Sequence, residues 1–375
     1  MAAAVPAVAA VAAVAAVAES VMKGSRQNRS SSARHQIYAG RVPEAGYAGW
    51  LRARQARMRT PARVIGASVR RATGESPDSS RRIIGGEINE VYEITTGRGR
   101  EVIVRICHDE DPRFEAERWA INAARARGVP APEVLLVETV DPGDGPEIAL
   151  CVERKLPGEP LDRLLRSAPL GELGLDVAQI AEVLRAIHGV EVDGFGYLRP
   201  DGRGWPISFA SIMLDLADKT GELAAAAARW DVPVASVEAG LDLLNRNRDR
   251  YGCDAARLVH GDFAARHLLV GDRKITGVLD FQECSGNHPV MDFVQWHVTG
   301  QDLAHPVPAA ALIEAYPDQA LPGPDFAPLF NLALLRHCLW MLMVYAEQDN
   351  PHRIENLKRD LARALSAPGT EELPA

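Results

Sequence analysis

The sequence predicts an α+β protein of two lobes, a small β-rich lobe followed by a larger helical lobe. Residues 83–155 contain five short segments with the two-residue alternation of β-strands and one segment with helical spacing. After Pro157 and Gly158 the apolar residues recur at helical spacing over longer segments. A chain of 375 residues is long enough for about two domains. A cleft between two such lobes is the expected ligand site.

The small lobe is expected to contain five strands and one helix. The helix ends at Gly128, with Pro130 just beyond it, as helices commonly do. The predicted elements, in order, are a strand, glycine turn and strand within 82–94, a strand at 101–107, a helix at 112–127, and strands at 134–140 and 148–153.

The larger lobe is expected to be mainly helical, with one short β-hairpin. The predicted helices are 176–189, 208–230, 236–251, 309–316, 328–348 and 353–365, and the predicted hairpin pairs 267–270 with 275–281. We therefore divide the chain into an N-terminal extension at 1–82, a nucleotide-binding lobe at 83–155, a helical catalytic and substrate-binding lobe at 156–366 and a tail at 367–375.

The N-terminal extension is of low complexity and basic, and we expect it to be poorly ordered. Residues 2–18 are almost entirely Ala and Val, but no Lys or Arg precedes them, which favours a low-complexity tail over a secretory signal, with Met22 as an alternative start. Residues 23–82 are rich in Arg, Ser and Gly, which favours a solvated basic arm over an arm that binds nucleic acid.

Charge and composition exclude several classes of protein. Residues 1–82 hold 14 basic and 4 acidic side chains, a net charge of +10, whereas the remainder holds 28 and 46, a net charge of −18. Because residues 83–375 are this acidic, we do not expect them to bind nucleic acid in general. The five cysteines are an odd number without close spacing, which indicates reduced thiols in the cytoplasm. No apolar run approaches the ~20 residues that span a bilayer once alanine is discounted, so no membrane is expected.

The residues with the clearest chemical potential lie in the segment 258–292. Asp262 follows His260 and Gly261 in a short loop, and Asp280 ends an apolar strand. Folding the hairpin brings the loop beside that strand end, so the two carboxylates meet among apolar residues. Such a pair is costly unless a cation or a substrate compensates it. A single Asp in a loop is more often a cap or turn residue, but the pair together favours catalysis.

Phosphoryl transfer uses two carboxylates in this way. One of them holds the metal that bridges the phosphates, and the other orients the attacking hydroxyl and accepts its proton. We therefore interpret Asp262 and Asp280 as the centre of a phosphotransferase site.

The segment that contains Asp262 and Asp280 resembles a known family. HGDFAARHLLV (260–270) followed by VLDFQE (278–283) is similar to the catalytic and metal-binding segments of aminoglycoside phosphotransferases and their choline-kinase relatives. The resemblance runs from about Arg82 to at least Tyr316 and implies a protein-kinase-like bilobal fold. It makes Asp262 the catalytic base, Asp280 the main Mg²⁺ ligand and Asp292 a structural residue, and it implies that His260 braces the catalytic loop.

Two positions depart from the family pattern. The Asn expected after HGD and four further residues is His267, and imidazole is a less natural ligand for Mg²⁺ than oxygen. His267 remains a candidate metal ligand beside Asp280, but contact with a phosphate or metal-bound water, or an altered second metal site, is favoured over direct ligation. The family's Gly-Asp-Pro is also Asn287, His288 and Pro289 here.

The small lobe supplies the candidate nucleotide contacts. A glycine pair between two strands is able to present backbone N–H groups to phosphates, although it is more often a simple hairpin. Arg105 interrupts an apolar strand, and the resemblance places it where these kinases bind phosphate, with Glu117 as its partner. The resemblance also places backbone groups of about residues 152–154, in the hinge between the two lobes, against the purine. The candidate nucleotide-binding residues are Gly85, Gly86, Asn89, Arg105, Glu117, Val152 and Arg154.

The sequence thus predicts an ATP- or GTP-dependent kinase that uses Mg²⁺ and phosphorylates a hydroxyl of a small molecule in the cytoplasm. The resemblance suggests an antibiotic as acceptor, for resistance or self-protection. The alternative of the same chemistry is a housekeeping kinase of a small alcohol or sugar. Less favoured are a metal-dependent hydrolase, built on the His and Asp residues of 258–292, and a non-catalytic nucleotide sensor.

Overall fold

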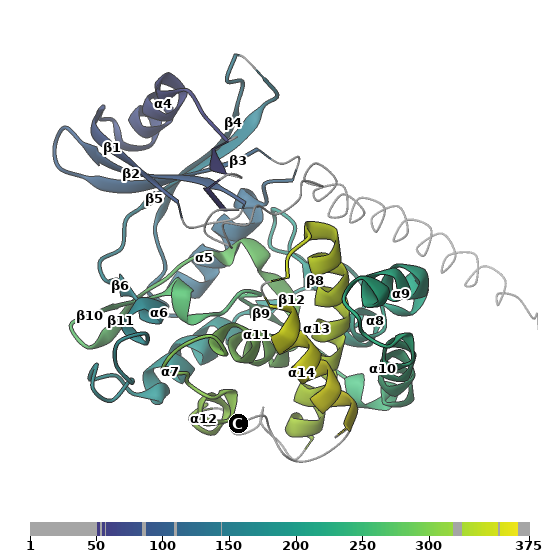
Figure 1. The fold of residues 1–375 in the computed structure, drawn as a ribbon. Helices are drawn as coiled ribbons and strands as arrows, with labels where there is room; N and C mark the ends of the chain where they lie inside the picture. The colour runs from purple at the N-terminus through teal and green to yellow at the C-terminus, as the bar shows by residue number, and fades with distance from the viewer. Residues whose placement is uncertain are drawn as a thin grey trace, which may run out of the picture.

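The chain forms a small lobe and a larger helical lobe joined at residues 155–158 (Figure 1). The computed structural model describes residues 51–52, 55–56, 58–84, 88–108, 111–143, 145–317, 325–351 and 353–366. The predicted extension before residue 51, the tail at 367–375, and Gly85 and Gly86 lie outside the described residues.

The small lobe is built on an antiparallel five-stranded sheet of order β1-β2-β3-β5-β4. Its strands are β1 (Pro77–Ile83), β2 (Glu90–Thr96), β3 (Glu101–Cys107), β4 (Val134–Val140) and β5 (Ile148–Arg154). The third and fourth of these have the bounds that the alternation predicted.

The two faces of this sheet pack against different helices. On β3, Val102, Val104 and Ile106 point to one face and form a core with helix α4 (Ala62–Thr73). The intervening Arg105 therefore points to the other face, where helix α5 (Phe114–Ala126) packs. The period of the strand thus places Arg105 on the side of the sheet that faces α5.

Residues 62–82 belong to the small lobe, although the sequence analysis assigned them to the basic extension. Ile65 and Val69 of α4 are buried against the sheet, and the exposed face of the helix carries arginines. Strand β1 pairs with β2 from Pro77 onward and exposes most of its polar side chains at the sheet edge. The amphipathic helix and the edge strand were not predicted because their many charged residues resemble a solvated arm.

The larger lobe contains helices and several short strands. In order they are β6 (Glu159–Pro160), α6 (Leu161–Leu164), α7 (Val177–His188), β7 (Glu191–Val192), β8 (Gly196–Tyr197), α8 (Phe209–Met213), η1 (Ala217–Lys219), α9 (Thr220–Arg229), α10 (Val234–Arg246), η2 (Arg248–Tyr251), β9 (Ala256–Val259), η3 (Ala265–His267), β10 (Leu268–Gly271), β11 (Lys274–Val278), η4 (Phe281–Glu283), β12 (Ser285–Asn287), α11 (Val290–Gly300), α12 (Ala309–Glu314), α13 (Phe326–Gln348) and α14 (Ile354–Ser366).

The predicted hairpin is present as β10 and β11, which pair antiparallel. A second small sheet, of order β7-β9-β12-β8, was not predicted because its strands are only two to four residues long. Strand β9 leads directly into the loop that carries Asp262, so these short strands fix where that loop begins.

The single helix predicted at 208–230 is wrong, because the structure divides it into α8, η1 and α9. Arg336 of α13 donates from Nε to the Ile212 carbonyl at 2.6 Å, and its Nη2 pairs with Asp215 at 2.7 Å. A carbonyl at the end of α8 is thus satisfied by a side chain, and the chain is free to turn.

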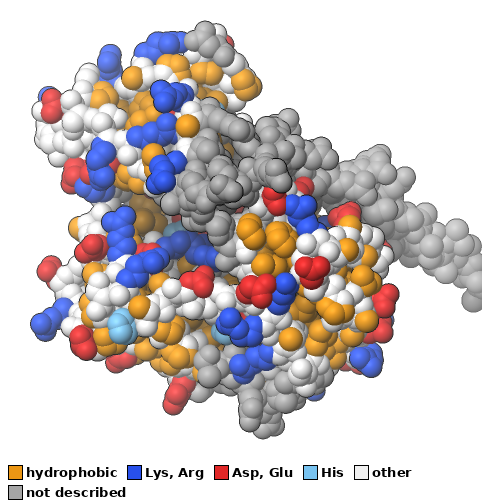
Figure 2. All heavy atoms as spheres, viewed as in Figure 1, with side chains coloured by type: hydrophobic (Ala, Val, Ile, Leu, Met, Phe, Trp, Pro, Cys, Tyr) orange, Lys and Arg blue, Asp and Glu red, His pale blue; other side chains and the backbone are white. Residues whose placement is uncertain are grey.

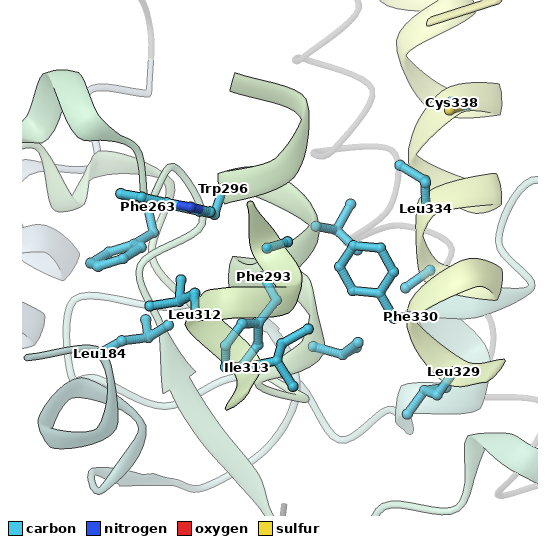
Figure 3. Packing of buried hydrophobic residues seen from close by; sticks show 14 of the residues in the cluster. Leu184, Phe263, Phe293, Trp296, Leu312, Ile313, Leu329, Phe330, Leu334 and Cys338 are labelled. Atoms are coloured by element: carbon cyan, nitrogen blue, oxygen red, sulfur yellow. The ribbon is translucent and has the colours of Figure 1, made fainter. Parts of the chain in front are cut away.

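Helix α13 corrects the expectation that no apolar segment reaches membrane-spanning length. Among the described residues, Phe326–Gln348 is long and apolar enough to cross a bilayer, but 61% of its most apolar window is buried inside the fold. It packs against α9, α10, α11 and α14. Figure 3 shows Phe330 and Leu334 of this helix beside Phe293 of α11 in the core of the larger lobe.

We expect Val69→Ala to lower the free energy of unfolding by about 1–3 kcal/mol, because Val69 is fully buried between α4 and the sheet. Arg70→Ala on the exposed face of the same helix should change it by less than about 0.5 kcal/mol. Urea unfolding of both variants measures this difference. Equal stabilities of the two variants would show that residues 62–73 are not part of the folded small lobe.

Candidate active site

The loop that carries Asp262 is held in place by a buried carboxylate. Asp292, in the first turn of α11, accepts hydrogen bonds from the backbone N–H groups of His260 (2.8 Å) and Gly261 (2.9 Å) and contacts His188 Nε2 at 3.0 Å. Gly261 has a φ of +79°, and a Cβ there would lie 2.0 Å from the Glu283 carbonyl oxygen. A glycine is therefore required at this position.

His260 and Phe263 fix the two sides of the same loop. The His260 Nε2 donates to the Leu279 carbonyl at 2.9 Å, and its Nδ1 accepts the Asp262 N–H at 3.2 Å. Both bonds suit a neutral ring, and burial lowers the pKa of His260. Phe263 is buried beside Trp296 of α11, with ring centroids 5.6 Å apart (Figure 3). His260 thus braces the loop against the strand end, as the sequence predicted.

Asp280 lies at the end of the hairpin in a left-handed backbone conformation, with φ 65° and ψ 64°. The Leu279 N–H donates to the His267 carbonyl at 2.8 Å, which joins the strand end to the Asp262 loop. The hairpin therefore brings the two predicted segments together.

A single imidazole lies between the two carboxylates. The His267 Nδ1 is 2.9 Å from the Asp262 carbonyl oxygen and 3.6 Å from Asp262 Oδ2. The His267 Nε2 is 3.6 Å from Asp280 Oδ2. Asp262 and Asp280 thus flank the same ring, which is the juxtaposition that the sequence predicted.

Two partners of Asp262 were missed by the sequence analysis. Arg266 Nη2 lies 2.5 and 2.6 Å from the two carboxylate oxygens, and Gln295 Nε2 donates to Oδ1 at 2.6 Å. The spacing of four residues between Asp262 and Arg266 is a signal for such a pair. Gln295 comes from α11 and gave no signal, since only the tertiary fold brings it to the loop.

Arg105 joins the small lobe to this site. Its Nη1 pairs with Glu117 Oε1 at 2.5 Å, and its Nη2 donates to Asp280 Oδ1 at 2.9 Å and to Gln282 Oε1 at 3.3 Å. The predicted ion pair with Glu117 is therefore present, and both side chains are buried. The same guanidinium also contacts the carboxylate that we assign to the metal site.

Glu153 is a third carboxylate near Arg105, which the sequence analysis did not identify. It lies on the same face of the sheet as Arg105, with Oε2 4.0 Å from Nη1, and it is 6% exposed. Burial raises the pKa of Glu153, and the nearby Glu117 carboxylate adds to this effect. Arg105 lowers the pKa only in part, so the net value is about 7. One guanidinium thus serves three carboxylates, and Glu153 holds a proton below neutral pH.

Asp280 responds differently to the same surroundings. Desolvation raises its pKa, but the neighbouring groups, with the Arg105 guanidinium foremost, together lower it more, and the net pKa lies below the ordinary value of 3.8. The carboxylate is 42% exposed in its side chain, whereas Glu117 and Glu153 are buried. Asp280 is therefore the ionised, accessible member of the group. Figure 2 shows basic side chains along the hollow between the two lobes.

Asn89 ties the start of β2 to the larger lobe. Its Nδ2 donates to Gln282 Oε1 at 2.7 Å, and Gln282 Nε2 donates to the Pro112 carbonyl at 3.1 Å. The Asn89 Oδ1 is buried and has no hydrogen-bond partner among the described residues. Val152 and Arg154 lie at the end of β5, just before the chain crosses to the larger lobe. Their assignment to the purine remains a prediction.

The residues required by the hydrolase alternative do not gather at one point. His288 lies against Phe209, with ring centroids 5.2 Å apart, and burial lowers its pKa to about 4. Asp292 is engaged with the backbone of the Asp262 loop. Within the described ranges, no three His, Cys, Asp or Glu side chains form a group that would hold a metal alone.

The donor set fits a magnesium ion that arrives with phosphates. Mg²⁺ is commonly bound through one or two carboxylates together with phosphate oxygens and waters, without a complete protein cage. Asp280 supplies one ionised oxygen, Oδ2, that is not used by Arg105. Asp280, with His267 beside it, would therefore hold the ion.

Comparison with known proteins shows which family and which fold the chain shares. The sequence profile described as the phosphotransferase enzyme family matches residues 79–328, which span both lobes. The hygromycin-B 4-O-kinase of Escherichia coli is 29% identical over 208 residues, 53% of this chain and 55% of that relative, so the match spans about half of its length.

Solved structures show the same protein-kinase-like fold. Aminoglycoside phosphotransferase APH(4)-Ia, in a ternary complex with AMP-PNP and hygromycin B, has a TM-score of 0.64 at 21% identity and covers 80% of this chain and 98% of its own. A fructosamine-3-kinase described as putative, from Thermobifida fusca, has a TM-score of 0.59 at 18% identity, covering 82% of this chain and 100% of its own. The predicted bilobal fold is thereby confirmed.

Glu153 gives the site a measurable pH dependence. Its pKa is higher in the folded chain than its ordinary value of 4.5, so the folded state binds more protons between these values. Its contribution to stability is therefore complete below about pH 4.5 and is lost as the pH rises through about 7. We expect Glu153→Gln, which stays neutral, to be more stable than the natural chain by about 1–3 kcal/mol at pH 8 and nearly equal to it at pH 5.

Urea unfolding of both proteins at pH 5, 6, 7 and 8 measures this difference. Glu147→Gln, an exposed carboxyl just before β5, is the matched control and should show no such pH trend. A stability difference for Glu153→Gln that does not grow with pH would contradict a protonated Glu153.

Proposed function

Since the chain belongs to the phosphotransferase enzyme family, we propose that it transfers the γ-phosphoryl group of a nucleoside triphosphate to a hydroxyl of a small molecule. One observation carries the proposal. Asp262 and Asp280, from separate segments, flank one imidazole at the point where Arg105 reaches over from the small lobe. Phosphoryl transfer requires this combination of a proton acceptor, a metal ligand and a cation for phosphate oxygens.

The acceptor hydroxyl would donate its proton to Asp262. The loop holds this carboxylate through Asp292, His260 and Phe263, so its position is set before any substrate binds. Gln295 and Arg266 restrict its rotation further through hydrogen bonds to its oxygens. Asp262 is therefore oriented and partly buried, as a proton acceptor should be.

The nucleotide would lie between the lobes, with its phosphates toward Arg105 and Asp280. A bound Mg²⁺ would supply positive charge that offsets the charge developing on the phosphate oxygens. Asp280 would hold that ion, and Arg105 would donate to phosphate oxygens while Glu117 keeps its guanidinium in position. We assign Gly85, Gly86 and Asn89 to the phosphates and the backbone of Val152 and Arg154 to the purine of ATP or GTP. Relatives of this fold bind ADP and AMP-PNP.

We propose an antibiotic as the acceptor, which would be inactivated by phosphorylation in resistance or self-protection. The similarity to a hygromycin-B 4-O-kinase supports this choice, although it spans about half of that relative. The second candidate function is that of a housekeeping kinase of a small alcohol or sugar. The similarity of fold to a fructosamine-3-kinase supports this second candidate. We place the reaction in the cytoplasm, where nucleoside triphosphates are available and where the five free cysteines stay reduced.

A mass-spectrometric screen tests the proposed function. The purified chain is incubated with ATP or GTP, Mg²⁺, and a panel of antibiotics, sugars and small alcohols. We expect a nucleotide-dependent gain of one phosphate by one class of acceptor. Phosphorylation of sugars but of no antibiotic would favour the housekeeping alternative. Phosphorylation of no compound would contradict transferase activity.

We expect Asp262→Ala to lower kcat by about 10²–10⁴, because the acceptor hydroxyl loses its proton acceptor. Asp262→Asn should lose a similar amount, since an amide keeps the shape but not the basicity. The matched control, Asp254→Ala, removes an exposed aspartate of the same lobe and should retain full activity. Steady-state kinetics with the identified acceptor measure the loss, and activity in Asp262→Ala within threefold of the natural chain would refute the assignment.

A further inference from the structure

His267 occupies the position at which related kinases carry an Asn, and its ring is held in one orientation. The ring is 13% exposed in its side chain and lies nearly parallel to His260, at 23° with centroids 6.0 Å apart. Its backbone N–H donates to the Ala264 carbonyl, and its carbonyl accepts from Leu279. Both the backbone and the ring of His267 are therefore fixed by their neighbours.

The hydrogen bond of the ring determines which nitrogen faces Asp280. Nδ1 lies 2.9 Å from the Asp262 carbonyl oxygen. A carbonyl oxygen only accepts hydrogen bonds, so Nδ1 carries the hydrogen. In the neutral ring Nε2 then has a free lone pair, and it lies on the side of Asp280 Oδ2, 3.6 Å away. Histidines that bind metals typically donate the other ring N–H to a carbonyl or carboxylate in this way.

The two atoms are suitably spaced to share one ion. Ligands that bind one ion at about 2.1 Å lie about 3–3.5 Å from each other when their directions differ by 90–110°. The observed 3.6 Å is close to this range and beyond a strong hydrogen bond. Asp280 Oδ1 accepts from Arg105, whereas none of the described residues donates a hydrogen bond to Oδ2, the oxygen 3.6 Å from His267 Nε2.

We propose that His267 Nε2 and Asp280 Oδ2 form a mixed nitrogen and oxygen ligand pair, which makes this site select Mn²⁺ or Co²⁺ over Mg²⁺ with the bound nucleotide. The inference rests on the proposed function, because it takes the ion to be the one that accompanies the phosphates. Mg²⁺ prefers oxygen ligands, whereas imidazole suits the first-row transition ions. An Asn at position 267 would offer an amide oxygen and would not give this preference.

Metal binding in the presence of AMP-PNP tests the selectivity without turnover. Electron paramagnetic resonance measures free Mn²⁺ during titration of the natural chain and of His267→Asn, and Mg²⁺ competition gives its affinity. We expect His267→Asn to weaken Mn²⁺ binding by about tenfold or more while Mg²⁺ binding changes by less than about threefold. His305→Asn, a substitution in the segment after α11, is the control and should leave both affinities unchanged.

A second measurement uses the natural chain alone and so does not depend on the folding of a variant. In the Co²⁺-loaded protein with AMP-PNP, the Nδ1 proton of a ligating histidine should give a paramagnetically shifted, exchangeable NMR signal. An unchanged Mn²⁺ to Mg²⁺ affinity ratio in folded His267→Asn, or the absence of that signal, would overturn the selectivity while leaving the proposed function intact. Failure of AMP-PNP to bind with any of the three ions would overturn both.

Discussion

The ion pairs of Arg105 set the relation between the two lobes. Arg105 belongs to the third strand of the small lobe, Glu117 to the helix beside it and Asp280 to the end of the hairpin in the larger lobe. A buried guanidinium is expensive to desolvate, and only close carboxylates compensate it. The strand, the helix and the hairpin must therefore stay near one another for the charge to remain paired. Removing Arg105 would leave the buried carboxylates without a compensating cation.

The same cluster contains more acid than base, and this excess matters for the chemistry. Three carboxylates surround one arginine, and the least exposed of them, Glu117 and Glu153, have raised pKa values, mainly because they are buried. Asp280 keeps its charge because Arg105 lies beside it and lowers its pKa. The carboxylate that faces the hollow between the lobes therefore stays negatively charged. A cation that arrives with phosphates meets an ionised oxygen there, while the neighbouring acid in the sheet stays protonated up to about neutral pH.

Sequence patterns predicted those parts of the fold in which local periodicity and tertiary packing agree. Strand 101–107 alternates clearly, and its period also explains why Arg105 leaves the apolar face. Helix 62–73 was missed because its buried stripe is narrow and its many arginines resemble a solvated arm. The Asp262 and Asp280 pair was predictable because a tight hairpin joins the two segments. Glu153 and Gln295 were not, since each reaches the site only through the packing of distant elements.

The hydrogen bonds of Asp262 leave one place for an acceptor. Its Oδ1 already accepts from Gln295 and from Arg266, which fills the lone pairs of that oxygen. Among the described residues, only Arg266 donates to its Oδ2, so one lone pair of Oδ2 remains. This oxygen is also the one 3.6 Å from the His267 ring, whose other nitrogen faces Asp280. In the proposed reaction, a hydroxyl that donates to Oδ2 would therefore lie near the His267 ring, and hence near Asp280 and the phosphates assigned to it. The hydrogen bonds from Gln295 and Arg266 thus orient the Asp262 carboxylate. They also determine which oxygen would accept the proton, because a hydroxyl that binds Oδ1 would first have to displace Gln295 or Arg266.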